Sequence, residues 1–478
     1  MSTQLPERPS LEHLKNEAKD LLKSAKKGDA SAAQAIGELK LANAQLAVAR
    51  EYGFASWSKL KRHIEGFDDR RDEFFSAIRA GDRARVAKVL DDDPAIVRAR
   101  NPHAFGETAI TAAANRDDRP MIDLLLERGV DVNARSDWWA GSFGALDFAS
   151  EETSAYLVKR GAKLTAHAAA RLGLVQELSS IIKHNPEVVH ERGGDGQFPL
   201  HFAKSAEVVD LLVAAGADLD ARDLDHESTA AQWRVKNREV LERLVYHGAS
   251  TDIFMAVALD DPDLIHEHLA ADPKALTRKT NEPGNPMVHH HAPGSPIYVY
   301  ELGFSRPLQV AANLDRPRAF ELLFEKSPPE ARLAAACWKG DRELAMVYRD
   351  YAPKLSGQDA AIICDAARYS HWDQVVLMLE MGIDVNAQDH ERMTPIHWAS
   401  FHGDSAGIAA VMPYRPNLEL KNVYGGTALS TLCYGSVNGW HREHDYAGAA
   451  ELLIGAGAIV LDRIAGTPAV NEVLARHR

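Results

Sequence analysis

The first of two histidine-rich stretches lies in residues 280–304, TNEPGNPMVHHHAPGSPIYVYELGF, where Pro and Gly surround His289, His290 and His291. Side chains alternate sides along an extended chain, so the first and third histidines could share one metal ion with a third ligand from elsewhere. The plainer alternative is a solvated loop with incidental histidines, and we assign no metal and no cofactor. Long loops inside a compact fold are usually functional or disordered. We therefore expect this insertion, with Tyr298, to contribute to a binding site as a finger over a groove.

The second stretch lies in residues 433–446, CYGSVNGWHREHDY. His441 and His444 are three positions apart and Asp445 follows, which would form a ligand or proton-transfer cluster if the segment were helical. The alternative is a set of side chains that only braces the loop. Trp440 stands directly before the cluster and is a further candidate for ligand contact.

One match to a catalytic motif is rejected. Gly403, Ser405 and Gly407 have the spacing of a hydrolase nucleophile elbow, which requires a strand before the serine and a helix after it. The preceding residues, TPIHWASF, instead predict a helix, so His402 and Gly403 form the ordinary turn between helices. The sequence contains no phosphate loop, HExxH pair, CxxC pair or dinucleotide fingerprint. Catalytic residues are therefore unknown, and whether the chain is an enzyme stays open.

The elements that must position these residues form an internal repeat. One phrase ends each unit: LLLERGVDVNAR (124–135), YLVKRGAKL (156–164), LLVAAGADLDARD (211–223), RLVYHGAS (243–250), MLEMGIDVNAQD (378–389) and LLIGAGA (452–458). A second phrase opens the units: ETAITAA at 107, FPLHFA at 198, STAAQW at 228, RPLQVAA at 306, TPIHWAS at 394 and GTALSTL at 426. Both phrases keep their order and spacing, which predicts a stacked array.

The physical reading of the pair is a helix, a tight turn, a second helix and an extended return. Thr or Ser caps the first helix, Pro occupies its first position, and Gly ends the second helix in a left-handed conformation. The motif resembles that of the ankyrin repeat family and is closest to it at TPIHWA, residues 394–399. The resemblance implies an all-α ankyrin-repeat solenoid of about eleven irregular helix-turn-helix units over residues 67–478, interrupted by the insertions at 280–304 and 433–446.

Residues 1–66 lack the repeat. Leu11, Leu14, Ala18 and Leu21 fall on one helical face, and a second short stripe follows Ser56. The segment resembles the helical part that precedes the repeats in many bacterial ankyrin proteins. The resemblance implies a bacterial source and a cap that covers the apolar end of the array.

Composition narrows the class of protein. Hydrophobic residues make up 45% and charged residues 26% of the 478 positions, so a core can be buried. The net charge of -13 argues against a nucleic-acid partner, because phosphate binding uses concentrated Lys and Arg. No apolar run of membrane-spanning length occurs, and three scattered cysteines fit a reducing compartment. We expect a cytoplasmic protein with no membrane partner.

The ankyrin resemblance also implies a concave surface built by the first helices and turn tips. The variable position of the opening phrase holds Phe148, Phe202, Trp233 and Trp398, and large rigid aromatics are typical of interface hot spots. Their alternative role is to fill gaps between helices. The predicted binding residues are Phe202, Trp233, His289, His290, His291, Tyr298, Trp338, Tyr369, Trp398, Phe401, His402, Trp440 and His441.

The sequence thus predicts a binding protein whose aromatic groove holds a protein, a peptide or a small ligand. An enzyme that uses metal-bound or acid/base histidines under the 280–304 loop is the alternative, because histidine titrates near neutrality and is a common metal ligand.

Overall fold

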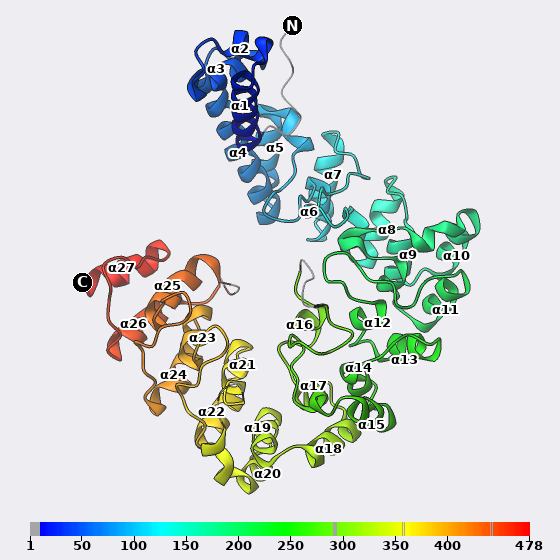
Figure 1. Ribbon diagram of the computed structural model, residues 1–478, viewed down its shortest axis with the longest axis vertical. Coiled ribbons are helices and arrows are strands. Elements are labelled where there is room, and N and C mark those ends of the chain that lie inside the picture. Colours follow the sequence, from blue (N-terminus) through cyan, green and yellow to red (C-terminus); the bar gives the residue numbers. More distant parts are fainter. Residues whose placement is uncertain (1–9, 290–293, 356, 358, 440, 442) are drawn as a thin grey trace. The chain divides into compact units, whose positions relative to one another are not determined.

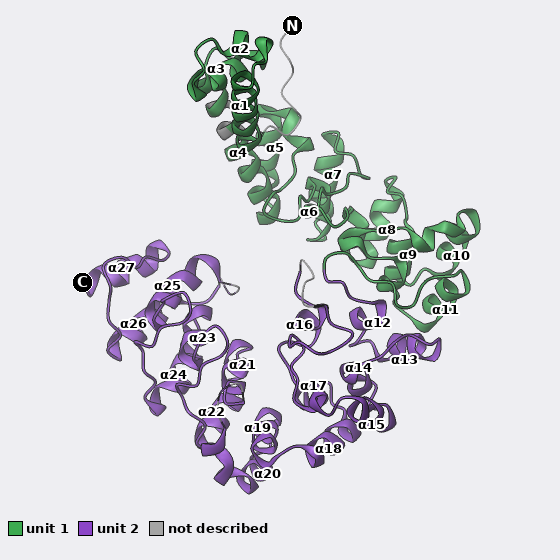
Figure 2. Cartoon of the chain, in the orientation of Figure 1, with its two compact units in different colours: residues 1–225 green, residues 226–478 purple. Residues whose placement is uncertain are grey.

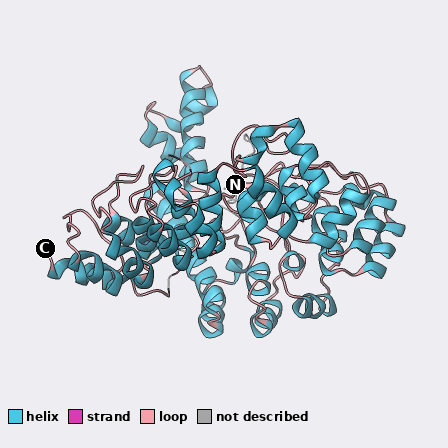
Figure 3. Cartoon of the chain, turned by 90° about the horizontal axis from the view of Figure 1, so that it is seen from below, coloured by secondary structure: helices cyan, strands magenta, loops and turns pink. Residues whose placement is uncertain are grey.

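The computed structural model describes residues 10–289, 294–355, 357, 359–439, 441 and 443–478. Over these residues the chain is helical and forms no strand, and an isolated bridge pairs Asn101 with Glu107 (Figure 3). The all-α prediction is confirmed. None of the helices in the described ranges combines the length and apolar character needed to cross a bilayer.

Contacts between Cα atoms divide the chain into two compact units, residues 1–225 and residues 226–478 (Figure 2). Each unit has its own buried apolar clusters, so each is described by itself.

Unit 1 begins with a helical segment that has its own core, built on Leu14, Val48, Leu60 and Ile64. The α-helices of the unit are labelled in Figure 1. Its helices are α1 (Leu11–Lys26), α2 (Ala30–Ile36), α3 (Leu41–Glu51), α4 (Trp57–Ala80), α5 (Arg83–Asp92), η1 (Pro94–Arg98), α6 (Ala109–Ala114), α7 (Arg119–Glu127), η2 (Ala145–Asp147), α8 (Glu151–Lys159), α9 (Ala166–Leu172), α10 (Val175–His184), η3 (Pro186–His190), η4 (Gly194–Gly196), η5 (Pro199–Phe202) and α11 (Ala206–Ala214).

The predicted boundary between residues 66 and 67 falls inside α4. The helix continues because its apolar side, which supplies Leu60 and Ile64 to the first core, goes on to supply Phe74 and Ile78 to the next core. One helix therefore joins the N-terminal segment to the repeats.

Unit 2 contains α12 (Ala230–Trp233), α13 (Arg238–Tyr246), α14 (Ile253–Ala258), α15 (Pro262–Ala271), η6 (Pro273–Leu276), α16 (Ile297–Glu301), α17 (Pro307–Asn313), α18 (Pro317–Lys326), α19 (Pro329–Lys339), α20 (Arg342–Val347), η7 (Arg349–Lys354), α21 (Ile362–Arg368), α22 (Trp372–Glu380), α23 (Pro395–His402), α24 (Ser405–Val411), η8 (Met412–Tyr414), α25 (Ala428–Asn438), α26 (Tyr446–Gly455) and α27 (Pro468–Arg476). The first helices of successive repeats touch, as α17 does with α19, α21 with α23 and α23 with α25.

The local signals of the repeat act as expected in the best-matching unit. Thr394 caps α23 and Pro395 takes its first position, and Gly403 ends the helix with a positive φ of 63°. Asp404 then caps α24, which begins at Ser405. The rejected hydrolase motif therefore covers the turn at Gly403 and Asp404 and the first residues of α24.

The described residues of the 280–304 insertion are tied into the core of unit 2. The buried carboxylate of Asp252 accepts hydrogen bonds from the Tyr298 hydroxyl (3.0 Å) and the Asn285 amide (2.8 Å). The side-chain amide of Gln232 donates to the Met287 carbonyl at 3.0 Å. Burial raises the pKa of Asp252, although these hydrogen bonds favour its ionised form.

Candidate functional site

A pocket of about 500 Å³ opens in unit 2 where α21, α23 and α25 follow one another. Its lining residues are Arg368, Glu391, Met393, Trp398, Phe401, Asn422, Tyr424, Gly426, Ser430, Thr431 and Tyr434. Two of these, Trp398 and Phe401, belong to the predicted binding residues. Aromatic rings make up much of the wall, and volumes of this size suit one or two inserted side chains or a small ligand.

The repeat motif itself holds Trp398 in place. The His397 imidazole lies 2.8 Å from the Thr394 hydroxyl, and its other nitrogen lies 3.1 Å from the Leu420 carbonyl of the next turn. The motif histidine therefore links two turns of the repeat. The Trp398 indole donates to an Asp389 oxygen at 2.9 Å, and only 4% of the residue is exposed. Trp398 therefore presents a fixed ring edge to the pocket.

The guanidinium of Arg368, which gives the pocket a positive charge, lies against two aromatic rings. The guanidinium carbon of Arg368 lies 4.7 Å from the Trp398 ring centroid and 4.6 Å from that of Phe304. Stacking of this kind orients a guanidinium and strengthens its contacts in a partly desolvated site. Phe304 belongs to the 280–304 insertion, so the insertion contacts a residue that lines the pocket.

Another part of the wall is built by two equivalent positions of neighbouring repeats. Phe401 and Tyr434 each follow a helix-capping threonine, Thr394 and Thr427, by seven positions. Their rings stack with centroids 6.4 Å apart. Tyr434 is 62% exposed and Tyr424, at the turn tip, is 79% exposed, so both are accessible to a partner.

A second pocket in unit 2, of about 430 Å³, contains Trp338 and Tyr369 from the prediction together with His371 and Tyr300. The Trp338 indole donates to the side-chain oxygen of Asn313 at 2.7 Å, and its ring lies edge-on to His371. The aromatic residues of the first helices thus line two successive hollows in the same unit.

Other predicted residues take different environments. Trp233 is half-buried against His226. Tyr298 is fully buried in the core, where it packs on Phe254 and is not available to a ligand on the surface. Phe202 lies in unit 1 in contact with His167.

In the insertion, the exposed His289 pairs with Glu227, whose carboxylate lies 2.6 Å from Nδ1. His290, His291 and Trp440 lie outside the described residues.

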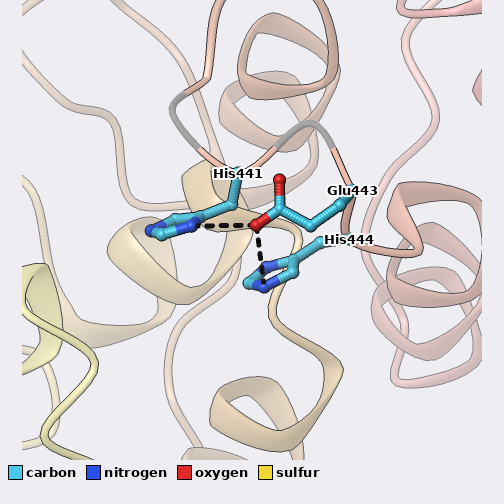
Figure 4. Close-up of side chains that lie close together, drawn as sticks. All are labelled: His441, Glu443 and His444. Carbon is cyan, nitrogen blue, oxygen red and sulfur yellow. Dashed lines mark hydrogen bonds and ion pairs between the residues drawn. The ribbon is translucent and has the colours of Figure 1, made fainter. Parts of the chain in front are cut away.

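The histidines of the second insertion gather at the end of α23. His441 and His444 are not on a helix, because α25 ends at Asn438 and α26 begins at Tyr446. Glu443 joins them, with Oε1 3.3 Å from Nδ1 of His441 and 4.0 Å from Nε2 of His444 (Figure 4).

The predicted third member of this cluster, Asp445, takes another role as the cap of α26, where it accepts from the Gly448 amide. Glu443 is not predicted from the sequence, because helical spacing would turn it away from both histidines.

His402 connects this cluster to the first pocket. Its ring lies 5.3 Å from that of His441 and is stacked at 6.0 Å on that of Trp398. Burial lowers the pKa of His402, and the nearby His441 and His444 lower it further, so this imidazole stays neutral at pH 7.

The sequence analysis also missed Arg368 and Tyr434. Tyr434 could have been identified from its position seven residues after the capping threonine, because Phe401 is a predicted binding residue at the same distance from its own capping threonine. No sequence signal identifies Arg368, since its importance comes from Phe304, which approaches it from a distant part of the chain.

The comparisons with known proteins agree with this architecture. Residues 363–410 match the family described as ankyrin repeats in many copies, and residues 105–137 and 195–224 match the single ankyrin repeat. The protein named Ankyrin repeat and SAM domain-containing protein 6, from Rattus norvegicus, is 29% identical over 103 residues. That alignment covers 21% of this chain and only 11% of the rat protein.

Among solved structures, the complex of the predatory endopeptidase Bd0816 from Bdellovibrio bacteriovorus with the immunity protein Bd3460 matches with a TM-score of 0.26 and 20% sequence identity. The match covers 36% of this chain and 97% of the matched chain. The family matches and the helical architecture together confirm the ankyrin-repeat solenoid.

Proposed function

We propose that this ankyrin-repeat chain is a binding protein, and that unit 2 takes up a segment of a partner protein at the pocket between Trp398 and Tyr434. The partner packs an apolar or aromatic side chain against the stacked rings of Phe401 and Tyr434, and a carboxylate of the same segment pairs with Arg368. The observation that carries the proposal is the pocket itself, whose walls come from equivalent positions of successive repeats.

Exposure and chemistry support a protein partner. Tyr424 and Tyr434 remain largely exposed although each offers a large, rigid apolar surface, and residues of this type dominate binding energy at protein interfaces. Val423 and Val437, each half exposed, extend the same apolar surface. Ankyrin repeats indicate a role in protein interaction, and the exposed aromatic side chains beside the pocket support this location for it.

The test is affinity purification of the full chain with mass spectrometry of the recovered proteins. We expect the Tyr424→Ala, Tyr434→Ala double variant to lose the partner by at least about tenfold, since each hot-spot residue contributes more than about 1 kcal/mol. Both side chains are exposed, so the variant keeps its fold, which circular dichroism and thermal melting verify.

The matched control is Tyr246→Ala. Tyr246 is 74% exposed, lies at the end of α13 and is absent from both aromatic pockets. The control variant should recover the same partners as the wild type. Equal recovery by the double variant and the wild type would contradict the assignment of the pocket.

A further inference from the structure

The cluster of His441, Glu443 and His444 has a geometry that its hydrogen bonds alone do not account for. The backbone amide of His444 donates to the His441 carbonyl at 3.2 Å, which forms a turn with both imidazoles on one side. The two rings are nearly parallel, with centroids 4.8 Å apart and planes at 11°. The Glu443 carboxylate faces the ring nitrogens of both (Figure 4).

The protonation of His444 follows from its partner. Its Nδ1 lies 2.8 Å from the His402 carbonyl, which can only accept, so Nδ1 carries the hydrogen. In the neutral ring the lone pair is then on Nε2, the nitrogen that faces Glu443. Metal-binding histidines are oriented in this way, with one nitrogen donating to a backbone carbonyl and the other turned to the metal.

The charges of the cluster also favour a cation. Glu443 brings its carboxylate within 4.0 Å of ring nitrogens of both histidines. In the tautomer described above, the lone pair on Nε2 of His444 faces this carboxylate, so two hydrogen-bond acceptors lie face to face. A single divalent ion between the two groups accepts electron pairs from both.

We propose that His441, Glu443 and His444 bind one divalent transition-metal ion of the zinc type. Two imidazoles and one carboxylate form a donor set that zinc accepts, and with three protein ligands the remaining position is filled by water. Zinc sets such donors about 2.0–2.2 Å from the ion, hence about 3.4 Å apart. The three donor atoms lie within 4.8 Å of one another, so small side-chain rotations complete the site. His402 separates the site from the aromatic pocket, and the proposal stands independently of the partner.

The test uses the full chain, stripped with a chelator and dialysed against Zn²⁺ or Co²⁺. We expect one equivalent of metal per chain by elemental analysis, and a visible d–d absorption band in the Co²⁺ form that reports the ligand field. The His441→Gln, His444→Gln double variant should lose at least about a hundredfold in affinity, and Glu443→Gln at least about tenfold. Affinity should fall on acidification, because protons compete for the imidazoles.

The matched control is His266→Gln, an exposed histidine on α15 away from the cluster, and it should bind as the wild type does. Melting curves recorded without metal check that every variant is folded. The proposal is overturned if the stripped wild type takes up no stoichiometric metal. It is equally overturned if the folded double variant takes up as much metal as the wild type.

Discussion

Substitution of Lys279 by Met should destabilise unit 2 by leaving a buried carboxylate without its cation. The Lys279 ammonium lies 3.1 Å from Oδ2 of Asp365 on α21, and both side chains are nearly buried. Removal of one partner of a buried ion pair costs about 3–5 kcal/mol, because the other charge stays desolvated. The residual exposure of this pair places the expected loss near the lower end of that range.

The loss depends on pH in a defined direction. Burial raises the pKa of Asp365 more than Lys279 lowers it. When folding raises the pKa of an acid, ionisation of that acid costs free energy of folding. This cost is absent below the pKa that the group has in the unfolded chain, and it grows as the pH rises. Without Lys279 the folded-state pKa rises further. The cost of Lys279→Met should therefore be larger at pH 8 than at pH 5.

Urea denaturation followed by tryptophan fluorescence and circular dichroism measures these effects. The Lys279→Met, Asp365→Leu double variant should recover most of the lost stability, because no unpaired charge remains. An exposed pair on α13, Arg238 and Glu242, serves as the control, and Arg238→Met should cost less than about 0.5 kcal/mol. The reasoning is refuted if Lys279→Met costs no more than this control, or if its cost does not increase with pH.

Two further predictions concern the helices around the pocket. Gly435→Ala should destabilise unit 2 by about 1–3 kcal/mol in denaturant titrations, because the new Cβ would lie 2.1 Å from the Phe401 carbonyl oxygen. The control Gly455→Ala has open space around the new Cβ and should change stability by less than about 1 kcal/mol. Equal effects of the two substitutions would contradict the close approach of the helices. NMR titration should give His397 a pKa below the usual histidine pKa of 6.5, because burial lowers it. The contribution of the neutral imidazole to stability is therefore complete above pH 6.5 and is lost on acidification, since the unfolded chain takes up the proton first. A pKa at or above 6.5 would contradict this prediction.

Much of the fold could be predicted because its signals are local. The capping Thr394, the terminating Gly403 and the motif His397 each act within one or two turns of the chain. The 32-residue spacing from Gly129 to Gly161 then extends each local signal into an array. Helix bounds were less predictable, as the continuous α4 illustrates, because apolar side chains on one helix can serve two cores.

The candidate site was predicted in part. Trp398 and Phe401 line the main pocket, and Trp338 and Tyr369 line the second, because the register of the repeat fixes which residues of the first helix face the same side. The same register does not apply to insertions. Tyr298 therefore lies in the core, where it contacts Asp252 instead of a ligand surface.

The sequence alone determined that this chain is a helical ankyrin-repeat solenoid and which positions of the repeat carry aromatic side chains. Only the tertiary structure decided how side chains from distant segments meet: Arg368 between Phe304 and Trp398, and Glu443 between two histidines that are not on a helix. The physical reason is that periodicity and capping depend on neighbours within one repeat. Contacts across repeats and insertions depend instead on how those segments stack, which no local pattern encodes.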